Sequence, residues 1–281
     1  IAFEPYYANY NSYSAINGVK IVPVLTRGET GFHLPERVEI EKKITKKTKA
    51  IIICNPSNPT GTVYTKEEME MLVSVCVKNN LFFISDEVYR EFVYDGKKYF
   101  SILRYMKKYP DKMILLDSLS KRYSLCGARL GMIVSLNRDL MDGVLRIAQG
   151  RLSSGFVDQA MAEKLTEVKD SYFKAVHLEY QTRRDLLYNG LKSIPGVYLE
   201  KPEGAFYTIV KLPVKNSEDF CQWLLTDFRY KNETVMVAPA AGFYGTKGMG
   251  KNEVRIAYVL NCQDLEKAIE ILRRALVEYN R

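Results

Sequence analysis

Apolar residues in the first half of the chain form short continuous runs that alternate with amphipathic segments. Between two of these runs, Thr65 is followed three residues later by Glu68, which is the spacing of a helix capping box. The helix that begins there would place its apolar residues on one face, at Met69, Leu72, Val73 and Cys76. Because the runs are continuous, we expect largely buried strands at residues 19–24, 50–54, 81–85, 113–116 and 130–134. This pattern predicts a doubly wound, mostly parallel α/β sheet.

Helical periodicity dominates from about Arg138, with breaks near residues 150–155 and before Pro195. A closing helix carries an apolar stripe at Leu265, Ala268, Ile269, Leu272 and Leu276. Short strands are predicted at residues 205–211, 235–237 and 254–258, with a helix between the first two. We therefore predict a large domain over residues 1–152, followed by connector helices and a smaller α+β domain over residues 153–281.

Composition narrows the class of protein mainly by exclusion. The chain has 281 residues, of which 47% are hydrophobic and 26% charged, as in an ordinary globular protein. We find neither an apolar run long enough to cross a bilayer nor a leader, so we expect a soluble cytoplasmic protein without a membrane partner. The net charge is +8, but basic residues are scattered among 33 acidic ones. This distribution fits an anionic small ligand and disfavours nucleic acid.

The cysteines and histidines exclude further classes of site. Five cysteines, odd in number and without CxxC spacing, are interpreted as buried reduced thiols rather than as disulfides or a zinc site. The two histidines, His33 and His177, are too far apart in sequence to form a local ligand pair. We predict no metal centre, so the chemistry must depend on Lys, Asp, Tyr and Arg.

Polar motifs follow three of the predicted strands. Asn-Pro-Ser-Asn-Pro-Thr-Gly occupies residues 55–61, Ser-Asp-Glu-Val-Tyr residues 85–89 and Ser-Leu-Ser-Lys residues 118–121. Arg129 lies eight residues beyond Lys121. Each motif alone is better explained by structure, as a turn, a helix cap or a solvated loop lysine. Ligands of open α/β sheets bind at the carboxyl ends of the strands. The convergence of the three motifs at these ends therefore favours a Schiff-base site with an anion receptor.

Taken in order, these motifs resemble those of the class I/II aminotransferases, which are pyridoxal-phosphate enzymes of fold type I. Gly-Ala-Phe-Tyr at residues 204–207 and Val-Arg-Ile-Ala-Tyr at residues 254–258 complete the series. Residues 31–35 and 120–124 are most similar to the bacterial aspartate aminotransferase branch. The resemblance implies a homodimer that transfers an amino group between an amino acid, aspartate or another acidic one, and a 2-oxo acid such as 2-oxoglutarate.

The resemblance also implies roles for residues around the cofactor ring. Lys121 would form a Schiff base with the aldehyde of pyridoxal 5'-phosphate and move the proton between the substrate Cα and the cofactor. Asp86 would keep the pyridine nitrogen protonated. Tyr89 and Asn58 would hydrogen-bond the ring oxygen O3′, and Asn58 would also contact the substrate.

Further roles concern the ring face, the phosphate and the substrate. Tyr7, or as a second choice Tyr6, would cover the ring. Ser118 and Arg129 would hold the phosphate, and Arg255 would bind the substrate α-carboxylate through its planar fork.

Three further features are Arg151, the residues beside Lys121 and a glycine-rich segment. Arg151, at the predicted connector, is a candidate for binding a side-chain carboxylate, and a structural ion pair is the competing interpretation. Ser120 and Arg122 flank Lys121 but are expected to serve packing and structure. The glycine-rich residues 241–250 are interpreted as a mobile loop near the substrate entrance rather than a phosphate cradle.

Several alternatives remain open. A β-lyase would use the same cofactor site, and a non-catalytic aminotransferase-like binding module is conceivable. The family's N-terminal segment has no counterpart here, so we expect the large domain to be N-terminally incomplete. A nicotinamide dehydrogenase is disfavoured because no GxGxxG turn follows a strand.

Overall fold

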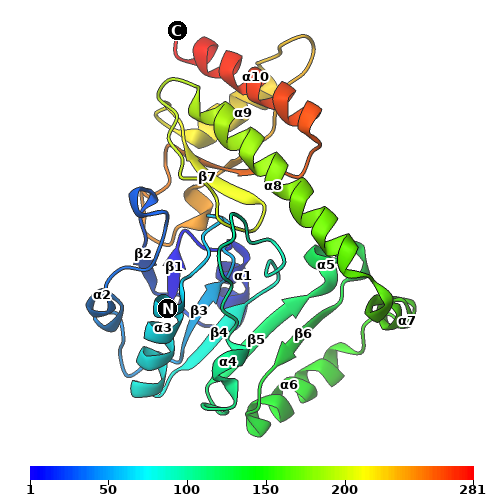
Figure 1. Cartoon of the computed structure of the whole chain (residues 1–281). Helices are drawn as coiled ribbons and strands as arrows, with labels where there is room; N and C mark the ends of the chain where they lie inside the picture. Colours follow the sequence, from blue (N-terminus) through cyan, green and yellow to red (C-terminus); the bar gives the residue numbers. More distant parts are fainter.

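The computed structural model describes residues 1–281 and contains two β-sheets with helices packed around them (Figure 1). The larger sheet has six strands in the order β2-β1-β3-β4-β5-β6. Strands β1 to β5 run parallel, and β6 pairs antiparallel with β5. The predicted fold class is therefore confirmed. The strand bounds are Ala2–Glu4 (β1), Pro23–Leu25 (β2), Ala50–Cys54 (β3), Phe82–Asp86 (β4), Met113–Ser118 (β5) and Gly131–Val134 (β6).

The smaller sheet is antiparallel and has three strands in the order β7-β9-β8. Its strands are Tyr207–Lys211 (β7), Ala238–Pro239 (β8) and Glu253–Ala257 (β9). The long helix α8 runs from the side of the larger sheet to the smaller sheet, where it lies beside α10 (Figure 1). The bounds are Asp170–Lys192 (α8), Ser217–Thr226 (α9) and Cys262–Tyr279 (α10). The predicted domain boundary at residue 152 stays a prediction.

Seven helices precede α8, and the predicted capping box begins one of them. The Thr65 hydroxyl accepts a hydrogen bond from the Glu68 amide at 3.2 Å, and the Glu68 carboxylate accepts one from the Thr65 amide at 2.7 Å. The apolar face predicted for this helix is buried. The helices are Asn9–Ile16 (α1), Arg37–Glu41 (α2), Lys66–Lys78 (α3), Leu103–Met106 (α4), Leu119–Arg122 (α5), Arg138–Arg151 (α6) and Phe156–Glu163 (α7).

Three strand predictions are wrong. The strand expected over residues 19–24 is reduced to Pro23–Leu25, because only these residues lie opposite the short strand β1, and Val19 is 60% exposed. Residues 130–134 were expected to be buried, yet Met132 is 43% exposed and Ile133 41% exposed. They lie on β6, an edge strand with a neighbour on one side only, so its faces are not covered as those of an inner strand are. The strand predicted at residues 235–237 is displaced to Ala238–Pro239, because these two residues are the ones that lie opposite β9.

Two large apolar cores meet near the carboxyl ends of β3 and β4. The first contains 17 buried residues from the larger sheet and helices such as α3. The second contains 26 residues, most of them from the C-terminal part of the chain, but it also includes Cys54, Tyr89 and Phe92. The two parts of the chain are therefore packed together at the edge of the sheet where the predicted site residues lie.

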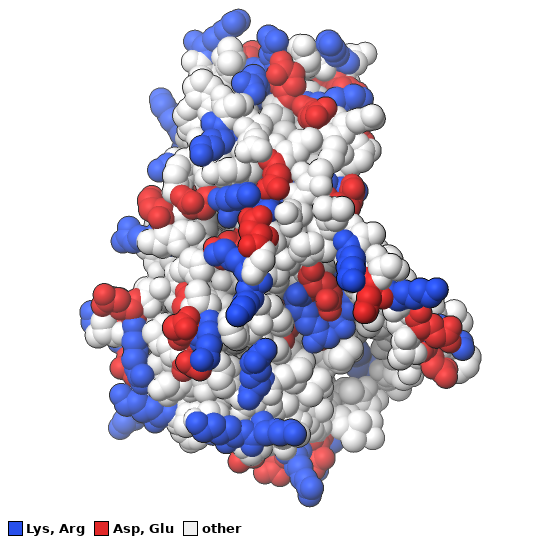
Figure 2. Space-filling model, in the orientation of Figure 1, with Lys and Arg blue, Asp and Glu red and all other residues white.

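The surface and the cysteines complete the description. Figure 2 shows basic and acidic side chains interspersed over the face in view, with no stripe of one sign. No helix is long and apolar enough to span a membrane. All five cysteines are free; Cys54, Cys76 and Cys221 are buried as predicted, Cys262 is half-buried and Cys126 is exposed.

Candidate active site

Lys121 lies on α5, a single helical turn that directly follows β5. The turn forms because the Ser118 hydroxyl caps it, accepting a hydrogen bond from the Ser120 amide at 3.0 Å. The Lys121 Nζ lies 5.9 Å from the ring centroid of Tyr89 and 6.0 Å from that of Phe206. It forms no hydrogen bond or ion pair with the protein. The lysine thus presents a free amine beside two aromatic rings.

Asp86 ends β4 and presents a carboxylate that is largely removed from water. Its polar partners are the Tyr10 hydroxyl, at 2.9 Å from Oδ2, and the Val88 amide, at 3.4 Å from Oδ1. Burial raises the pKa of Asp86 to about 6, and the hydrogen bond from Tyr10 acts in the opposite direction. A cation placed against this carboxylate would be stabilised by it.

Tyr10 is a site residue that the sequence interpretation missed. It lies on α1, just after β1, and so reaches the sheet edge that also carries Asp86. Its own pKa is raised well above 10 by burial and by the Asp86 charge, so it stays a hydrogen-bond donor. Its position just after a strand end was a signal in the sequence. However, four tyrosines occur within residues 6–13, and the sequence does not show which of them reaches Asp86.

Arg255 is linked to Tyr89 by hydrogen bonds that run through Asn58. Its Nη1 donates to Asn58 Oδ1 at 3.2 Å, and Asn58 Nδ2 lies 3.5 Å from the Tyr89 hydroxyl. The guanidinium carbon lies 4.6 Å from the ring centroid of Tyr207 and 5.0 Å from that of Phe243. Its Nε is buried without a hydrogen-bond partner. The guanidinium is therefore held in place with donor capacity to spare.

Tyr7 and Tyr6 differ in burial and in their contacts within the protein. Tyr7 is half-buried, and its hydroxyl accepts a hydrogen bond from Asn9 Nδ2 at 2.9 Å. Its ring packs edge-on against that of Tyr10, with centroids 5.5 Å apart. Tyr6 is buried and donates to Asn11 Oδ1 at 2.8 Å. Tyr7 is therefore the more accessible of the two rings.

The antiparallel pairing of β5 with β6 brings Ser118 close to the segment that carries Arg129. The Ser118 hydroxyl donates to the Leu130 carbonyl at 3.1 Å. Arg129 is exposed, has a positive φ of 52°, and donates from Nη1 to the Cys126 carbonyl at 2.8 Å. The two predicted phosphate ligands are thus neighbours, although the arginine is turned to its own 3-10 turn at Cys126–Ala128.

Contacts within the chain are formed by Ser120 and Arg122, which were expected to serve packing and structure, and by the glycine-rich loop. Arg122 Nη2 lies 2.7 Å from the carboxylate of Asp117, and Ser120 Oγ lies 2.8 Å from Ser118 Oγ. In the glycine-rich loop, the amides of Gly245 and Thr246 donate to the buried carboxylate of Glu4 at 2.8 and 2.9 Å. These amides therefore hold a carboxylate of the same chain.

Arg151 is the last residue of α6 and is exposed. Its side chain forms no hydrogen bond and no ion pair within the chain, so the structural ion pair considered for it is not formed there.

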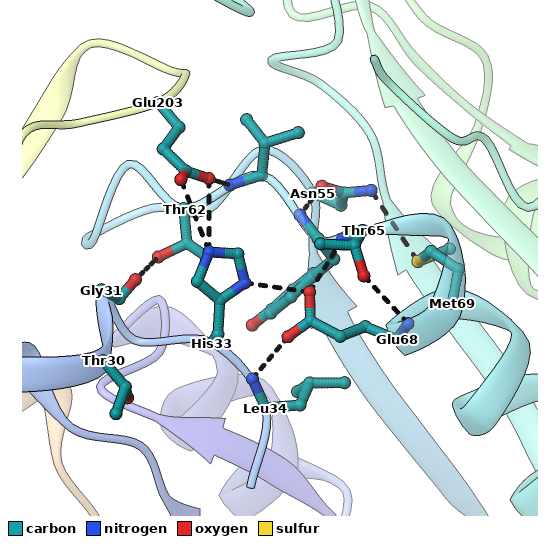
Figure 3. Close-up of polar contacts among 12 residues, drawn as sticks. Thr30, Gly31, His33, Leu34, Asn55, Thr62, Thr65, Glu68, Met69 and Glu203 are labelled. Atoms are coloured by element: carbon teal, nitrogen blue, oxygen red, sulfur yellow. Dashed lines mark hydrogen bonds and ion pairs between the residues drawn. The ribbon is translucent and has the colours of Figure 1, made fainter. Parts of the chain in front are cut away.

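A second polar cluster, which the sequence interpretation also missed, lies where the two parts of the chain meet (Figure 3). His33 Nδ1 lies 2.9 Å from Glu68 Oε2, and His33 Nε2 lies 3.5 Å from Glu203 Oε1. Glu68 also accepts from the Leu34 amide at 2.7 Å, and Glu203 from the Val63 amide at 3.1 Å. Hydrogen bonds that His33 donates to the Glu203 and Glu68 carboxylates raise the pKa of His33 to about 9. The cluster joins the start of α3 to the segment that leads into β7.

A mostly parallel sheet carries a lysine and a carboxylate at its carboxyl edge, and an arginine from the smaller sheet is hydrogen-bonded to Asn58 at the same edge. The family model for aminotransferase class I and II matches residues 1–272, and the chain belongs to this family. It is an aminotransferase, as the resemblance in its motifs implied. Class I aminotransferases of this family use pyridoxal phosphate.

Individual relatives agree with this assignment. The chain is 31% identical over 280 residues to an aspartate aminotransferase of Pyrococcus horikoshii, covering 97% of this chain and 68% of the relative. It is 32% identical over 280 residues to aromatic-amino-acid aminotransferase 2 of Thermococcus litoralis, covering 98% and 69%. The structure of Thermus thermophilus aspartate aminotransferase with maleate superimposes with a TM-score of 0.86 at 27% identity, covering 98% of this chain and 69% of that one.

Proposed function

We propose that this aminotransferase transfers the amino group of an acidic amino acid to a 2-oxo acid, with pyridoxal phosphate held at the carboxyl ends of β3, β4 and β5. The observation that carries the proposal is the convergence of Lys121, Asp86 and Arg255. They supply a free amine beside aromatic rings, a desolvated carboxylate and a guanidinium with an unpartnered, buried Nε.

The residues present fit this cofactor. A carboxylate removed from water is stabilised by a cationic partner, and Asp86 has only a hydroxyl and an amide as partners within the protein. A protonated pyridine nitrogen would supply that cation. The free amine of Lys121 suits attachment through an aldehyde. Pyridoxal phosphate, when bound, supplies an electron sink for the charge that develops at the substrate Cα.

The other predicted ligands surround the same place. Tyr89 and Asn58 would hold the ring oxygen, because their polar groups already lie 3.5 Å apart and face the same network. Ser118 and Arg129 would hold the phosphate, which requires the Arg129 side chain to leave the Cys126 carbonyl. Tyr7 would cover the ring face.

In the proposed reaction, residues of the protein bind and orient the substrate and move a proton. Lys121 would accept the proton from the substrate Cα and return it to the cofactor side, and the rings of Tyr89 and Phe206 lie 5.9 and 6.0 Å from its amine. Arg255 would bind the α-carboxylate with the donors that Asn58 does not use.

The names of relatives and the net charge both bear on the substrate class. The printed names of relatives include aspartate and aromatic-amino-acid aminotransferases, and maleate, a dicarboxylate, accompanies the Thermus thermophilus enzyme. The net charge of +8 favours acidic substrates without selecting one. Arg151, which has no ion-pair partner, is the proposed ligand for the second carboxylate.

We also propose that the protein is a cytoplasmic homodimer. Exposed apolar residues on and beside α6 and α7 support a dimer in which a second copy of the chain covers this face. They are Ile147 at 76%, Leu152 at 74%, Phe156 at 82% and Val157 at 75% exposure. Five free cysteines support a reducing compartment. Light scattering coupled to gel filtration would give a dimer mass, and a monomer mass would contradict the proposal.

Reduction with borohydride tests the cofactor site. The purified protein is loaded with pyridoxal phosphate, reduced and digested, and the label is located by peptide mapping. We expect it on Lys121, and we expect aspartate and 2-oxoglutarate to exchange an amino group. A label elsewhere, or transfer from neutral donors only, would contradict the assignment of the site or of the substrate.

A further inference from the structure

Four charged residues connect the two turns that carry Lys121 and Tyr89. Asp117 precedes the residue that caps α5, Arg122 follows Lys121 directly, and Arg90 and Glu91 follow Tyr89. The side chain of Asp117 is 1% exposed and that of Arg122 is 12% exposed. Asp117 and Arg122 are therefore part of the interior that supports the site, although no member of the cluster was assigned a role there.

The contacts within the cluster centre on Asp117. Its Oδ2 lies 2.7 Å from Arg122 Nη2 and 2.8 Å from Arg90 Nη2. Its Oδ1 accepts a hydrogen bond from the Ser118 amide at 2.8 Å, so both oxygens are used. A single buried carboxylate thus contacts the residue after Lys121, the residue after Tyr89 and the cap of α5.

Glu91 closes the cluster on its outer side. Its Oε1 lies 3.1 Å from Arg122 Nε and 3.6 Å from Arg90 Nε. Two carboxylates and two guanidinium groups alternate, so the cluster carries no net charge. Removing Asp117 would leave two partly buried arginines with only the more exposed of the two carboxylates that they share.

Backbone pairing cannot replace this connection. The last backbone hydrogen bond between the two segments runs from the Glu87 amide to the Leu116 carbonyl at 2.9 Å. Beyond it, no backbone hydrogen bond joins the turn after β4 to the turn after β5. The side chains around Asp117 are the next connection along the two strands, and they come just where the lysine and the tyrosine are placed.

We propose that Asp117 is a positioning residue of this aminotransferase, which sets the place of the Lys121 amine relative to Tyr89 through its ion pairs with Arg122 and Arg90. The proposal rests on the function proposed above for Lys121. Asp117 does not touch the substrate or the cofactor. Its effect is to hold the two turns at a fixed separation. Loss of Asp117 should therefore lower kcat more than it weakens substrate binding, because Arg255, the proposed substrate ligand, lies on a different sheet.

Two variants and one control test this role. Asp117→Asn keeps the shape and removes the shared charge, and Arg122→Gln removes one of the two links. Arg37→Gln is the control, because Arg37 pairs with Glu41 at 3.0 Å in an exposed ion pair on α2, outside the cluster. Hydrogen exchange is measured on the protein without cofactor, and kcat and KM on the loaded enzyme.

We expect exchange in residues 87–93 and 119–124 to become about 10-fold faster in both variants and to stay unchanged in the control. We expect kcat to fall about 10-fold to 100-fold because the reacting groups are misplaced, with KM for the amino donor changed less than about 2-fold. Arg122→Lys, which keeps the charge, should recover part of kcat.

Three results would overturn the proposal: unchanged exchange and kcat in both variants, exchange that rises evenly over the chain, or a rise in KM alone. If Asp117→Asn does not fold, Arg122→Gln decides by the same criteria. Failure of the parent protein to label at Lys121 would contradict the proposed function, whereas the exchange measured without cofactor would still decide whether Asp117 holds the two turns together.

Discussion

The hydroxyl of Tyr10 donates a hydrogen bond of 2.9 Å to the carboxylate of Asp86, although the two residues are 76 positions apart in the chain. The contact joins the helix after β1 to the end of β4. A phenol that donates to a carboxylate stabilises its ionised form, and burial of Asp86 has the opposite effect. The balance between them decides at which pH Asp86 can hold a cation.

Tyr10→Phe should therefore shift the pH dependence of cofactor binding upward. Loss of the hydrogen bond raises the pKa of Asp86 above its value of about 6, so the carboxylate becomes protonated at a higher pH. We expect the dissociation constant for pyridoxal phosphate, measured from pH 5.5 to 8.5, to rise on the acidic side at higher pH than in the parent. Tyr6→Phe, which loses a bond to Asn11 instead, is the control and should leave the profile unchanged.

Asp86→Asn should lower turnover by about 10²-fold, the effect of losing one preorganised electrostatic contact. The substitution should not destabilise the fold. Because folding raises the pKa of Asp86, the ionised carboxylate destabilises the folded state at neutral pH. Thermal unfolding at pH 7.5 without cofactor should occur at the same or a higher temperature than in the parent. Unchanged turnover would remove Asp86 from the proposed mechanism.

Arg255→Lys should weaken amino-acid binding and leave cofactor binding intact. A lysine keeps the charge but lacks the planar fork that contacts Asn58 and stacks on Tyr207. We expect KM for the amino donor to rise about 10-fold or more, as for the loss of one charged hydrogen bond. A variant that loses cofactor while substrate affinity stays normal would show that the residue has been given the wrong role.

Arg151→Ala tests the choice of substrate. If Arg151 binds a second carboxylate, the substitution should cost dicarboxylic donors roughly 1.5–3 kcal/mol and spare neutral ones. The kcat/KM values for aspartate and alanine are compared in parent and variant. An equal loss for both donors would make Arg151 structural.

The His33 cluster should stabilise the fold at neutral pH and lose this effect in alkali. Because the folded pKa is about 9 and the ordinary value is 6.5, the contribution is complete below pH 6.5 and disappears as the pH rises through 9. His33→Gln should lower the free energy of unfolding by roughly 1–2 kcal/mol at pH 6.5, after allowance for solvent screening, and by little at pH 10. Urea unfolding at the two pH values checks this, and an equal loss at both would show that protonation plays no part.

Features that depend on neighbouring residues in the chain could be predicted from the sequence. The bounds of β3 coincide with the apolar run at residues 50–54, and the Thr65 capping box forms as predicted, because both depend on contacts within a few residues. The motifs after β3, β4 and β5 were predicted to meet because parallel strands present their carboxyl ends at one edge. The aminotransferase family could be inferred from their order.

Tertiary structure decided what depends on contacts between distant segments. The exposure of β6 follows from its place at the edge of the sheet, which its apolar composition does not reveal. His33 meets Glu203 across 170 positions, and Tyr10 meets Asp86 across 76. Asp117 pairs with Arg90 only because β4 and β5 are neighbours. Local sequence specifies which side chains stand at the strand ends, but their partners and pKa values arise from packing, which brings charges together and removes water from them.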